Sequence, residues 1–188
     1  MHRPAPRPAT VSPGDDPLLV ERALLGDSDA YDELYRRHRD RVSRLAYLLL
    51  GDPDQAQDTA QEAFLVGWRD LRRLRDPGLF RPWVTGIAVN LCRRRRRATA
   101  RALAAAASES EAPSPDQGDA VALRLAVRRA VDALPRHMQE VVVLRFYCGL
   151  GEAEMAETLG IAAGTVKSRL GRARARLALV LRPVVEVE

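Results

Sequence analysis

The feature that most constrains this chain is a pair of helical patterns on either side of a glycine, over residues 152–182. The first pattern is short and acidic, and it ends at Gly160, where a helix C-cap favours a residue that accepts left-handed backbone angles. The second pattern repeats apolar residues at helical spacing, at Val166, Leu170, Ala173 and Leu177. These positions predict packing against the apolar positions of the first helix, Met155, Ala156 and Leu159. The segment is therefore expected to fold as a helix-turn-helix.

The opposite face of the second helix is small at its centre and basic along both flanks. The central residues are Ser168, Gly171 and Ala175, and the flanking residues are Lys167, Arg169, Arg172, Arg174 and Arg176. Small residues let a backbone approach base edges, and cations suit the phosphates that border a major groove. Thr165 is placed to cap this helix. The pattern favours DNA recognition, with a solvated surface helix as the simpler alternative.

Composition and charge segregation support a helical protein with a polyanionic partner. Of 188 residues, 46% are hydrophobic and only 5% are aromatic, which favours small aliphatic cores. The net charge is +5, and it is unevenly distributed. Arginines dominate residues 69–97, whereas residues 52–62 contain acids and no base. The basic stretch is expected to meet nucleic acid, and the acidic one need not.

Breaks in the helical pattern divide the chain into segments. We predict four helices over residues 17–25, 28–50, 52–73 and about 81–97, the second capped by Ser28. Two further helices are predicted over residues 120–133 and 136–148, before the helix-turn-helix. The expected fold class is all-α, with two small helical domains joined by a flexible linker. The expected domains are a disordered leader (1–16), a first domain (17–97), a linker (98–119) and a helix-turn-helix bundle (120–182).

Aromatic residues lie among the arginines of the first domain, at Trp68, Phe80 and Trp83. Unstacked bases can stack on such rings while guanidinium groups hold phosphates, which is typical of single-strand binding. Burial of both tryptophans in a helical core is the competing interpretation. Phe80 follows the Asp76-Pro77-Gly78 break and is harder to place in a core. The arginine run at 93–97 also fits a membrane-surface or localisation patch.

Motifs for catalysis, metal binding and secretion are not recognisable in the sequence. It contains no phosphate-binding glycine loop, no nucleophile elbow and no histidine-glutamate metal motif, so we expect no enzymatic activity, no cofactor and no metal. Cys92 and Cys148 lie in apolar patterns and are expected to be buried free thiols. The leader has no apolar core and no segment is long enough to span a membrane, so a cytoplasmic location is expected.

The order of these segments resembles the extracytoplasmic-function group of bacterial RNA polymerase sigma factors. The resemblance spans about residues 17–181. The matching runs are ALLGDSDAYDELYRRH, DTAQEAFLVGW and FRPWVTGIAVNLCRR in sigma region 2, and LPRHMQEVVVLRFYCGLGEAEMAETLGIAAGTVKSRLGRARARL in region 4. The resemblance implies an alternative sigma factor that binds core RNA polymerase and promoter DNA and helps to melt the minus-10 region. An anti-sigma factor is the usual regulator in this family.

The resemblance also implies a role for individual residues. Polymerase docking would fall to Asp58, Gln61 and Glu62. The minus-10 element would be contacted by Arg72, Arg75, Phe80, Trp83, Asn90, Arg93 and Arg94, with a flipped base received by the loop before Phe80. The minus-35 element would be contacted in the major groove by Thr165, Lys167, Ser168, Arg169, Gly171, Arg172 and Arg176.

Two departures from the family pattern bear on promoter preference. Relatives often have a larger side chain where this chain has Gly171, and they commonly have an acid near the end of the fourth helix, where this chain has unbroken arginine. Two other functions fit parts of the sequence. A free-standing helix-turn-helix regulator with an N-terminal dimerisation or sensor domain leaves the acidic stretch without a role, and an RNA-binding helical protein leaves the helix-turn-helix without one.

Overall fold

The computed structural model describes residues 15–106 and 119–185, with side chains over 15–102 and 125–181, and every regular element in these ranges is helical. The first unit contains α1 (Asp16–Leu24), α2 (Ser28–Leu50), α3 (Pro53–Asp70) and α4 (Phe80–Ala106), with short 3-10 turns η1 (Leu71–Arg73) and η2 (Pro77–Leu79) before α4. The second unit contains α5 (Asp119–Asp132), α6 (Arg136–Val142), the π-helical turn η3 (Val143–Tyr147), α7 (Glu152–Leu159) and α8 (Ala163–Val185). The predicted all-α fold class is confirmed.

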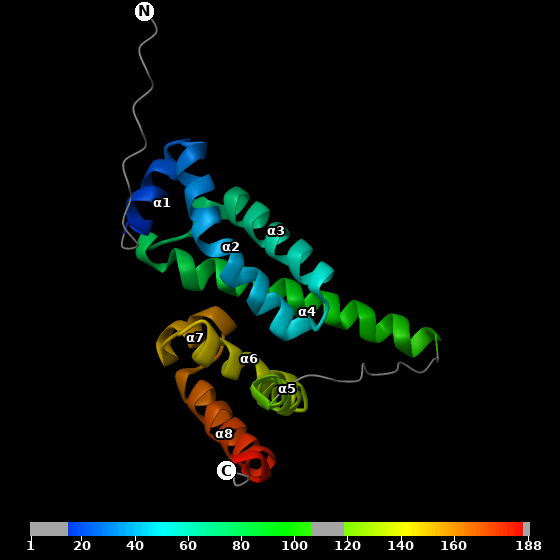
Figure 1. The fold of residues 1–188 in the computed structure, drawn as a ribbon. Coiled ribbons are helices and arrows are strands. Elements are labelled where there is room, and N and C mark those ends of the chain that lie inside the picture. Colours follow the sequence, from blue (N-terminus) through cyan, green and yellow to red (C-terminus); the bar gives the residue numbers. More distant parts are fainter. Residues whose placement is uncertain (1–14, 107–118, 186–188) are drawn as a thin grey trace, which may run out of the picture.

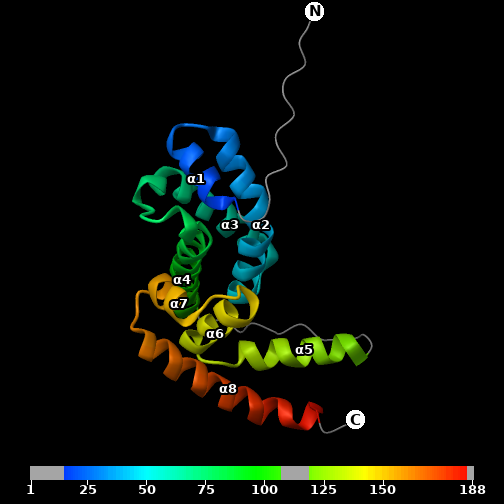
Figure 2. The same cartoon turned by 90° about the vertical axis from the view of Figure 1, so that its left-hand side faces the viewer.

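The two units stack on one another, and α4 is the longest helix of the first (Figures 1 and 2). In both views α6 and α7 lie next to the first unit, while α5 and α8 lie on the outer side of the second. One hydrophobic cluster contains buried residues of α2, α3 and α4 together with buried residues of η3, α7 and α8. The sequence predicts two domains, and their cores are in contact.

The core of the first unit follows from the helical spacing of its aliphatic residues. Leu34, Val42, Leu45 and Leu49 recur along one face of α2, and each is at most 2% exposed. They meet small residues of α3 such as Ala60 and Ala63, which allow the two helices to approach closely. Tyr31 donates a hydrogen bond to the carbonyl of Phe64 at 2.6 Å and so fixes α2 against α3.

Side-chain caps determine where α2 and α3 begin. Ser28 was predicted to cap α2, but the cap is Asp27, whose carboxylate accepts a hydrogen bond from the Ala30 amide at 3.1 Å. Asp52 caps α3 in the same way through the Gln55 amide at 2.9 Å, and Pro53 follows at a position where its missing N–H costs nothing. The positive end of the helix dipole also stabilises a carboxylate at the helix N-terminus. This interaction favours Asp27 over the neighbouring Ser28 as the cap.

Helix α4 continues beyond its predicted end near Arg97. It runs to Ala106, so the first residues of the predicted linker, 98–106, are helical. Alanine and arginine have high helix propensity, and this local preference extends the helix although those side chains are exposed up to residue 102. The rest of the predicted linker, up to residue 118, and the predicted leader as far as residue 14 lie outside the described residues.

A half-buried cluster of polar and charged side chains joins α1 to α2. Asp16 Oδ2 lies 2.6 Å from His38 Nε2, and Asp16 Oδ1 accepts a hydrogen bond from Arg37 Nη1 at 3.2 Å. The Asp16 side chain is 19% exposed. Burial acts to raise the pKa of Asp16, but the hydrogen bonds and charges of His38 and Arg37 outweigh it, and the pKa of this carboxyl lies below its ordinary value.

Replacing Asp16 with asparagine should destabilise the protein at neutral pH but not at low pH. A carboxyl whose pKa is lowered by folding contributes stability above its unfolded pKa, and that contribution is lost as the pH falls through the folded pKa. We expect Asp16→Asn to reduce the free energy of unfolding by about 1–2 kcal/mol at pH 7. Urea denaturation at pH 7 and near pH 3 measures it, with exposed Glu21→Gln on the same helix as the control. An equal deficit at both pH values would contradict the role of this charge.

Candidate nucleic-acid interface and docking face

The basic helix of the second unit exposes the face that its sequence predicts. Val166, Leu170 and Ala173 are buried, which confirms most of the predicted apolar arc. Val166 and Leu170 share a cluster with Met155 and Leu159 of α7 as predicted. Ala173 and the partly buried Leu177 instead pack in a smaller cluster with residues of the α5–α6 region. The exposed residues are Lys167, Ser168, Gly171, Arg172, Arg174, Ala175 and Arg176, and we call this surface the α8 strip.

Local geometry fixes how α8 leaves the turn. Gly160 has φ 65°, and the Ile161 amide donates to the Ala156 carbonyl at 3.0 Å, so a left-handed C-cap ends α7 as predicted. Thr165 was predicted to cap α8, but the helix begins two residues earlier, and the amides of Thr165 and Val166 already donate to the Ala162 carbonyl. Thr165 is therefore a half-buried residue of the first turn.

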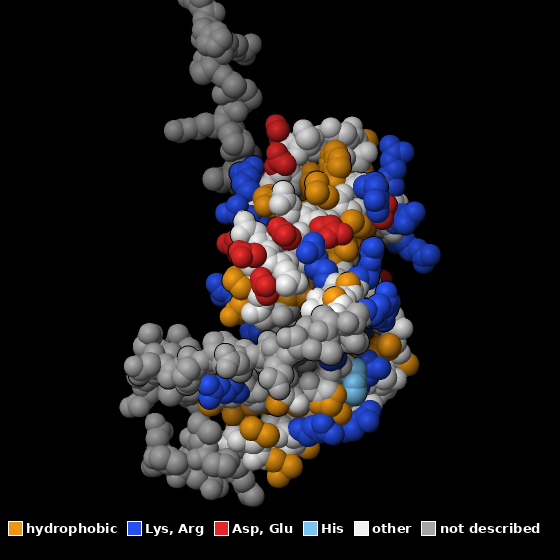
Figure 3. Space-filling model, turned by 90° about the vertical axis from the view of Figure 1, so that its right-hand side faces the viewer, with side chains coloured by type: hydrophobic (Ala, Val, Ile, Leu, Met, Phe, Trp, Pro, Cys, Tyr) orange, Lys and Arg blue, Asp and Glu red, His pale blue; other side chains and the backbone are white. Residues whose placement is uncertain are grey.

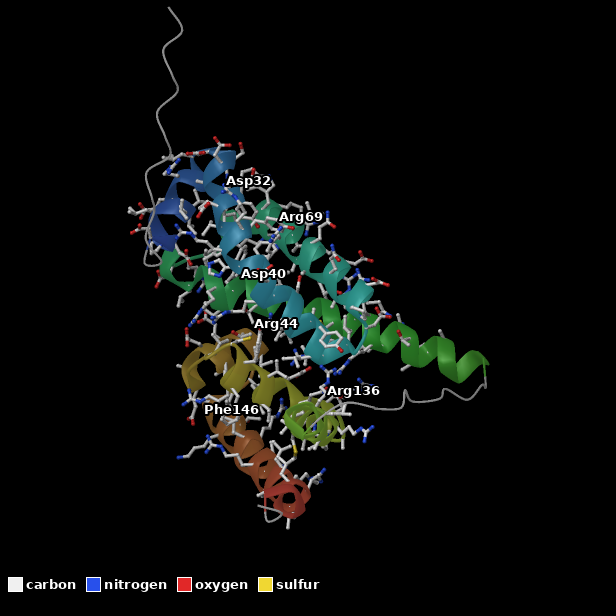
Figure 4. The ribbon with its side chains drawn as sticks, viewed as in Figure 1. Asp32, Asp40, Arg44, Arg69, Arg136 and Phe146 are labelled. Carbon is white, nitrogen blue, oxygen red and sulfur yellow. The ribbon has the colours of Figure 1, made fainter. Side chains whose placement is uncertain are left out.

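Arg172 is held along the α8 strip by the helix itself. Its Nε donates to the Ser168 carbonyl at 3.3 Å and its Nη2 to Ser168 Oγ at 3.4 Å. Apart from the adjacent backbone of α8 itself, nothing lies within 4 Å of the position that a Cβ of Gly171 would occupy, so packing does not require glycine there. In Figure 4, Phe146 lies beside α8, and the Arg174 guanidinium carbon is 5.7 Å from its ring centroid. The strip thus combines exposed cations with an open, small centre.

A second site lies where the 71–79 turns meet α4. A cavity of about 340 Å³, which we call the loop pocket, is a size typical of small-ligand sites. It is lined by Arg73, Leu74, Arg75, Asp76, Leu79, Pro82, Trp83, Gly86, Ile87 and Asn90 of the first unit, and by Glu157 and Thr158 of α7. Of the residues predicted to contact the minus-10 element, Arg75, Trp83 and Asn90 line it. Arg72 is exposed on the adjoining turn but is not part of its wall.

Phe80 is not available for the predicted DNA contact in this structure. It is 0% exposed and packs against three rings, those of Tyr31, His38 and Trp83. The preceding turn directs it inward, because Asp76 Oδ1 accepts the Gly78 amide at 2.8 Å and sets the start of α4 behind it. Trp68 is 42% exposed and Trp83 is half-buried, so neither tryptophan is fully buried in the core.

The arginine run of α4 divides into paired and unpaired side chains. Arg93 makes two hydrogen bonds to Glu140, at 2.8 and 2.7 Å, which hold the pKa of its guanidinium above the ordinary value. Arg95 pairs with Glu62 at 2.9 Å, and Arg96 donates to Gln139 at 2.8 Å. Arg94 is exposed and has no ion pair with a described residue. The run is therefore not a uniform basic patch.

The predicted docking residues lie on α3 but differ in exposure. Asp58 and Gln61 are exposed, whereas Glu62 is half-buried beside Arg95. Beside Gln61 the structure adds an apolar groove of about 480 Å³ between α2 and α3, which includes Leu65 and Trp68. Sequence reasoning missed it, although Leu65 and Trp68 stand three residues apart on the acidic helix. Figure 3 shows acidic side chains gathered on the upper unit, and Figure 4 places Asp32 and Arg69 at the same end of the α2–α3 pair.

The remaining sequence expectations concern thiols, metals and membranes. Cys92 and Cys148 are free and buried as predicted, and burial raises their pKa values to about 12 and about 11. Among the described residues, no group of histidine, cysteine and acidic side chains could hold a metal ion. In the same ranges, none of the helices has the length and apolar character needed to cross a membrane.

Comparison with known families identifies the family to which the chain belongs. The profile described as "Sigma-70 region 2" matches residues 34–102, and "Sigma-70, region 4" matches residues 124–177. The chain is 38% identical over 166 residues to "ECF RNA polymerase sigma factor SigM" of Mycobacterium tuberculosis (strain ATCC 25618 / H37Rv), covering 88% of this chain and 84% of the relative. The chain is an extracytoplasmic-function sigma factor of the sigma-70 family. It acts in transcription initiation as an alternative sigma factor, and the free-standing regulator is not favoured.

Further relatives extend this similarity. The sigma factor is 30% identical over 186 residues to "ECF RNA polymerase sigma-E factor" of Escherichia coli (strain K12), covering 90% of this chain and 96% of the relative. Its fold matches CnrH, solved in complex with the cytosolic domain of CnrY, with a TM-score of 0.70, 27% identity and coverage of 89% and 97%. It also matches the fold of RpoE in a complex with NepR from Bartonella quintana, with a TM-score of 0.69, 24% identity and coverage of 81% and 96%.

Truncating Phe80 should unfold this sigma factor's first unit, not selectively weaken DNA binding. Removing a fully buried aromatic ring leaves a cavity, so Phe80→Ala should cost about 3–5 kcal/mol of stability. Thermal unfolding followed by circular dichroism measures the loss. Phe80→Leu, which preserves most of the volume, should cost less than about 1.5 kcal/mol. A Phe80→Ala protein with wild-type stability but impaired DNA binding would contradict this prediction and would support a direct contact between Phe80 and DNA.

Proposed function

We propose that the sigma factor divides promoter recognition between its two units. Region 2, residues 17–97, would hold the melted minus-10 element, region 4, residues 120–182, would read the minus-35 element, and residues 98–119 would join them. The observation that carries this proposal is that one chain exposes two chemically different surfaces, each with groups that suit nucleic acid. The α8 strip has small residues between cations, whereas the loop pocket combines a tryptophan ring, arginines and an exposed asparagine.

The α8 strip suits double-stranded DNA. A helix enters the major groove with few side chains reaching base edges, while flanking arginines meet the phosphates. Lys167, Ser168 and Arg172 would contact bases near the centre, with Arg169 and Arg176 on the flanks and Thr165 at the first turn. The open space at Gly171 would let a relative place a larger side chain against the bases without disturbing the fold. Gly171 is therefore the position where promoter preference should diverge.

The loop pocket suits an unpaired base. Flipping a base costs a few kcal/mol, which stacking and edge hydrogen bonds must repay. Trp83 offers part of a ring face, Asn90 offers an amide that can donate and accept, and Arg75 offers a cation at the rim. Arg72 and Arg94 are exposed and would follow the phosphates of the opened strand. Phe80 would support the pocket from behind through its contact with Trp83.

The exposed side of α3 suits docking on core RNA polymerase. Asp58 and Gln61 present polar groups, and Leu65, 65% exposed, and Trp68 present an apolar surface beside them. Stable protein interfaces commonly have such an apolar centre with a polar rim. Glu62 would contribute less to direct contact, because Arg95 already occupies its carboxylate. Polymerase docking on this surface would explain why a chain of basic net charge contains an acidic helix.

Similar proteins support a proposal for regulation and location. The matched structure of CnrH was solved with the cytosolic domain of CnrY, and we extend this to an anti-sigma partner that would withhold the factor from polymerase. The factor would act in the bacterial cytoplasm, where RNA polymerase works, without catalytic activity of its own. Reconstitution tests the proposal: the protein is mixed with core polymerase and promoter templates, and run-off transcripts are measured. Absence of both core binding and transcripts would reject it.

Reversing one charge on α3 should weaken polymerase docking while sparing DNA. Asp58 is exposed, so Asp58→Arg removes a docking group without breaking an internal ion pair. We expect about a tenfold loss of affinity for core polymerase, because complementary charges set the association rate. Fluorescence titration of core enzyme measures it.

The matched control for Asp58→Arg is Glu21→Arg, an equal reversal at an exposed site on α1. It should retain wild-type affinity for core enzyme. Equal loss in both variants would indicate a general charge effect and would remove α3 from the docking face.

Truncating Arg172 should impair use of the minus-35 element and leave polymerase binding intact. One good base contact contributes roughly 1–3 kcal/mol, so Arg172→Ala should weaken binding to matched promoters by about that amount. Competition between templates with intact and scrambled minus-35 sequences measures the loss. Arg129→Ala, an exposed arginine on α5, is the control. If Arg172→Ala weakens both templates equally, Arg172 contacts phosphate and does not read sequence.

A further inference from the structure

A cavity rich in arginine lies beside the C-terminal end of α2, apart from the loop pocket. Its volume is about 540 Å³, which is in the range of small-ligand sites. Residues of α2, α4, α5, α6 and α8 line it, so it is a concave site that several helices surround. We call it the arginine pocket, and its polar and charged lining residues are Arg96, Arg128, Asp132, Arg136, Gln139 and Arg176.

A chain of hydrogen bonds fixes two of these arginines. Asp132 is the only acid that lines the pocket, and it accepts from Arg128 Nε at 2.7 Å and from Gln139 Nε2 at 3.1 Å. Gln139 is buried, and its Oε1 accepts from Arg96 Nη2 at 2.8 Å. Because glutamine is neutral, this contact orients Arg96 without compensating its charge.

The other two arginines of the pocket are unpaired. Neither Arg136 nor Arg176 forms a hydrogen bond or an ion pair with another residue that the structure describes. Figure 4 shows Arg136 at the junction of α5 and α6. Burial of Arg96, and then the positive charge of Arg136, lower the pKa of the Arg96 guanidinium, although an arginine remains charged at neutral pH. The lining therefore gathers like charges that the protein itself leaves uncompensated.

The charge and size of the pocket indicate the chemistry of a ligand. Four arginines and one aspartate give the lining a net charge of +3. A single phosphate group carries about −1.5 to −2 charges at pH 7, so linked phosphates match this charge better. Guanidinium groups bind phosphate oxygens in a two-pronged geometry, which a monovalent or spherical anion does not use. The pocket is thus suited to a small polyanion.

Two features of the surroundings bear on this assignment. The C-terminal end of α2 lines the pocket and carries partial negative charge, but Arg128 already donates to the Tyr47 carbonyl there, at 3.3 Å. Duplex DNA presents a convex backbone, which fits an exposed helix better than a cavity surrounded by helices. A small ligand is therefore favoured over the promoter as the occupant.

We propose that the arginine pocket binds a small anion with two or more linked phosphate groups, such as the triphosphate group of a nucleotide. Arg96 and Arg136 would contact the phosphates from α4 and α6, and Arg176 would add a third cation from α8. Arg128 would keep its contact with Asp132 and hold the wall in place. The proposal is independent of the promoter contacts assigned above, except that Arg176 also belongs to the α8 strip.

Calorimetric titration of the full chain tests the class of ligand. The probes are sodium triphosphate, inorganic phosphate, ATP and AMP, at constant ionic strength and with a chelator present so that divalent cations do not neutralise the phosphates. Triphosphate should bind at least about tenfold more tightly than inorganic phosphate, and ATP more tightly than AMP. Equal affinities for triphosphate and ATP would identify the phosphates alone as the ligand, whereas tighter binding of ATP would identify a nucleotide.

Arg136→Ala is the variant that isolates the pocket, because this side chain is exposed and has no partner to lose. It should weaken triphosphate binding about tenfold or more, since a charge-assisted hydrogen bond is lost. Without ligand its melting temperature should be no lower than that of the wild type, because repulsion with Arg96 is relieved. Saturating triphosphate should raise the melting temperature of the wild type and have little effect on the variant.

The matched control is Arg97→Ala, which removes the same charge from the exposed neighbour of Arg96 on α4. It should retain wild-type affinity for triphosphate. Absence of triphosphate binding, or equal affinity for ATP and AMP, would overturn the proposal. An equal loss in Arg97→Ala would overturn it too, because the attraction would then come from net charge. If Arg136→Ala weakened duplex promoter DNA as much as triphosphate, the cluster would be a contact to the DNA backbone instead. The triphosphate titration contains neither polymerase nor promoter, so failure of the proposed function is seen separately.

Discussion

Helix α4 is the constraint on which the rest of the structure depends, because its surface packs against several other helices at once. Val84, Ala88 and Val89 are fully buried and close the core of the first unit. Gly86, on the same helix, accepts the backbone of α7 at van der Waals distance. The arginines that follow reach α3 on one side and α6 on the other. The part of α4 before its exposed end therefore contacts both units.

The division of the arginine run follows from helix geometry. Consecutive residues point about 100° apart, so five arginines in a row cannot all face one partner. Arg93 and Arg96 stand three positions apart and reach α6 together, whereas Arg95 points back to α3. Exposed ion pairs contribute little to stability, but the nearly buried Glu140 makes its pair sensitive to the loss of either member. A run that composition alone presents as one basic patch therefore combines structural and free cations.

The helices could be predicted from the sequence because periodicity and breaking residues are local signals. Gly160 and the Asp52-Pro53 pair mark ends and starts through the backbone angles and caps they favour. Phe80 could not be placed, because the turn that Asp76 closes on the Gly78 amide decides whether the ring points inward. The Arg93–Glu140 pair could not be predicted from the sequence either, because the two residues are distant in sequence and both residue types are common on protein surfaces. The groove at Leu65 and Trp68 had a signal, two exposed apolar residues on one helical face, which the acidic neighbours obscured.

The length of chain between the units limits how they can separate. Residues 107–118 connect the described end of α4 to α5, and such a segment spans at most about 40 Å when fully extended. One turn of DNA is about 34 Å long, so this segment alone reaches little more than one turn. Wider separation requires more chain from the exposed end of α4, where residues 98–102 make no core contacts, or release of α5 from Tyr47. The contacts that join the units and the chain that connects them are therefore neighbours in the structure, and promoter spacing should depend on both.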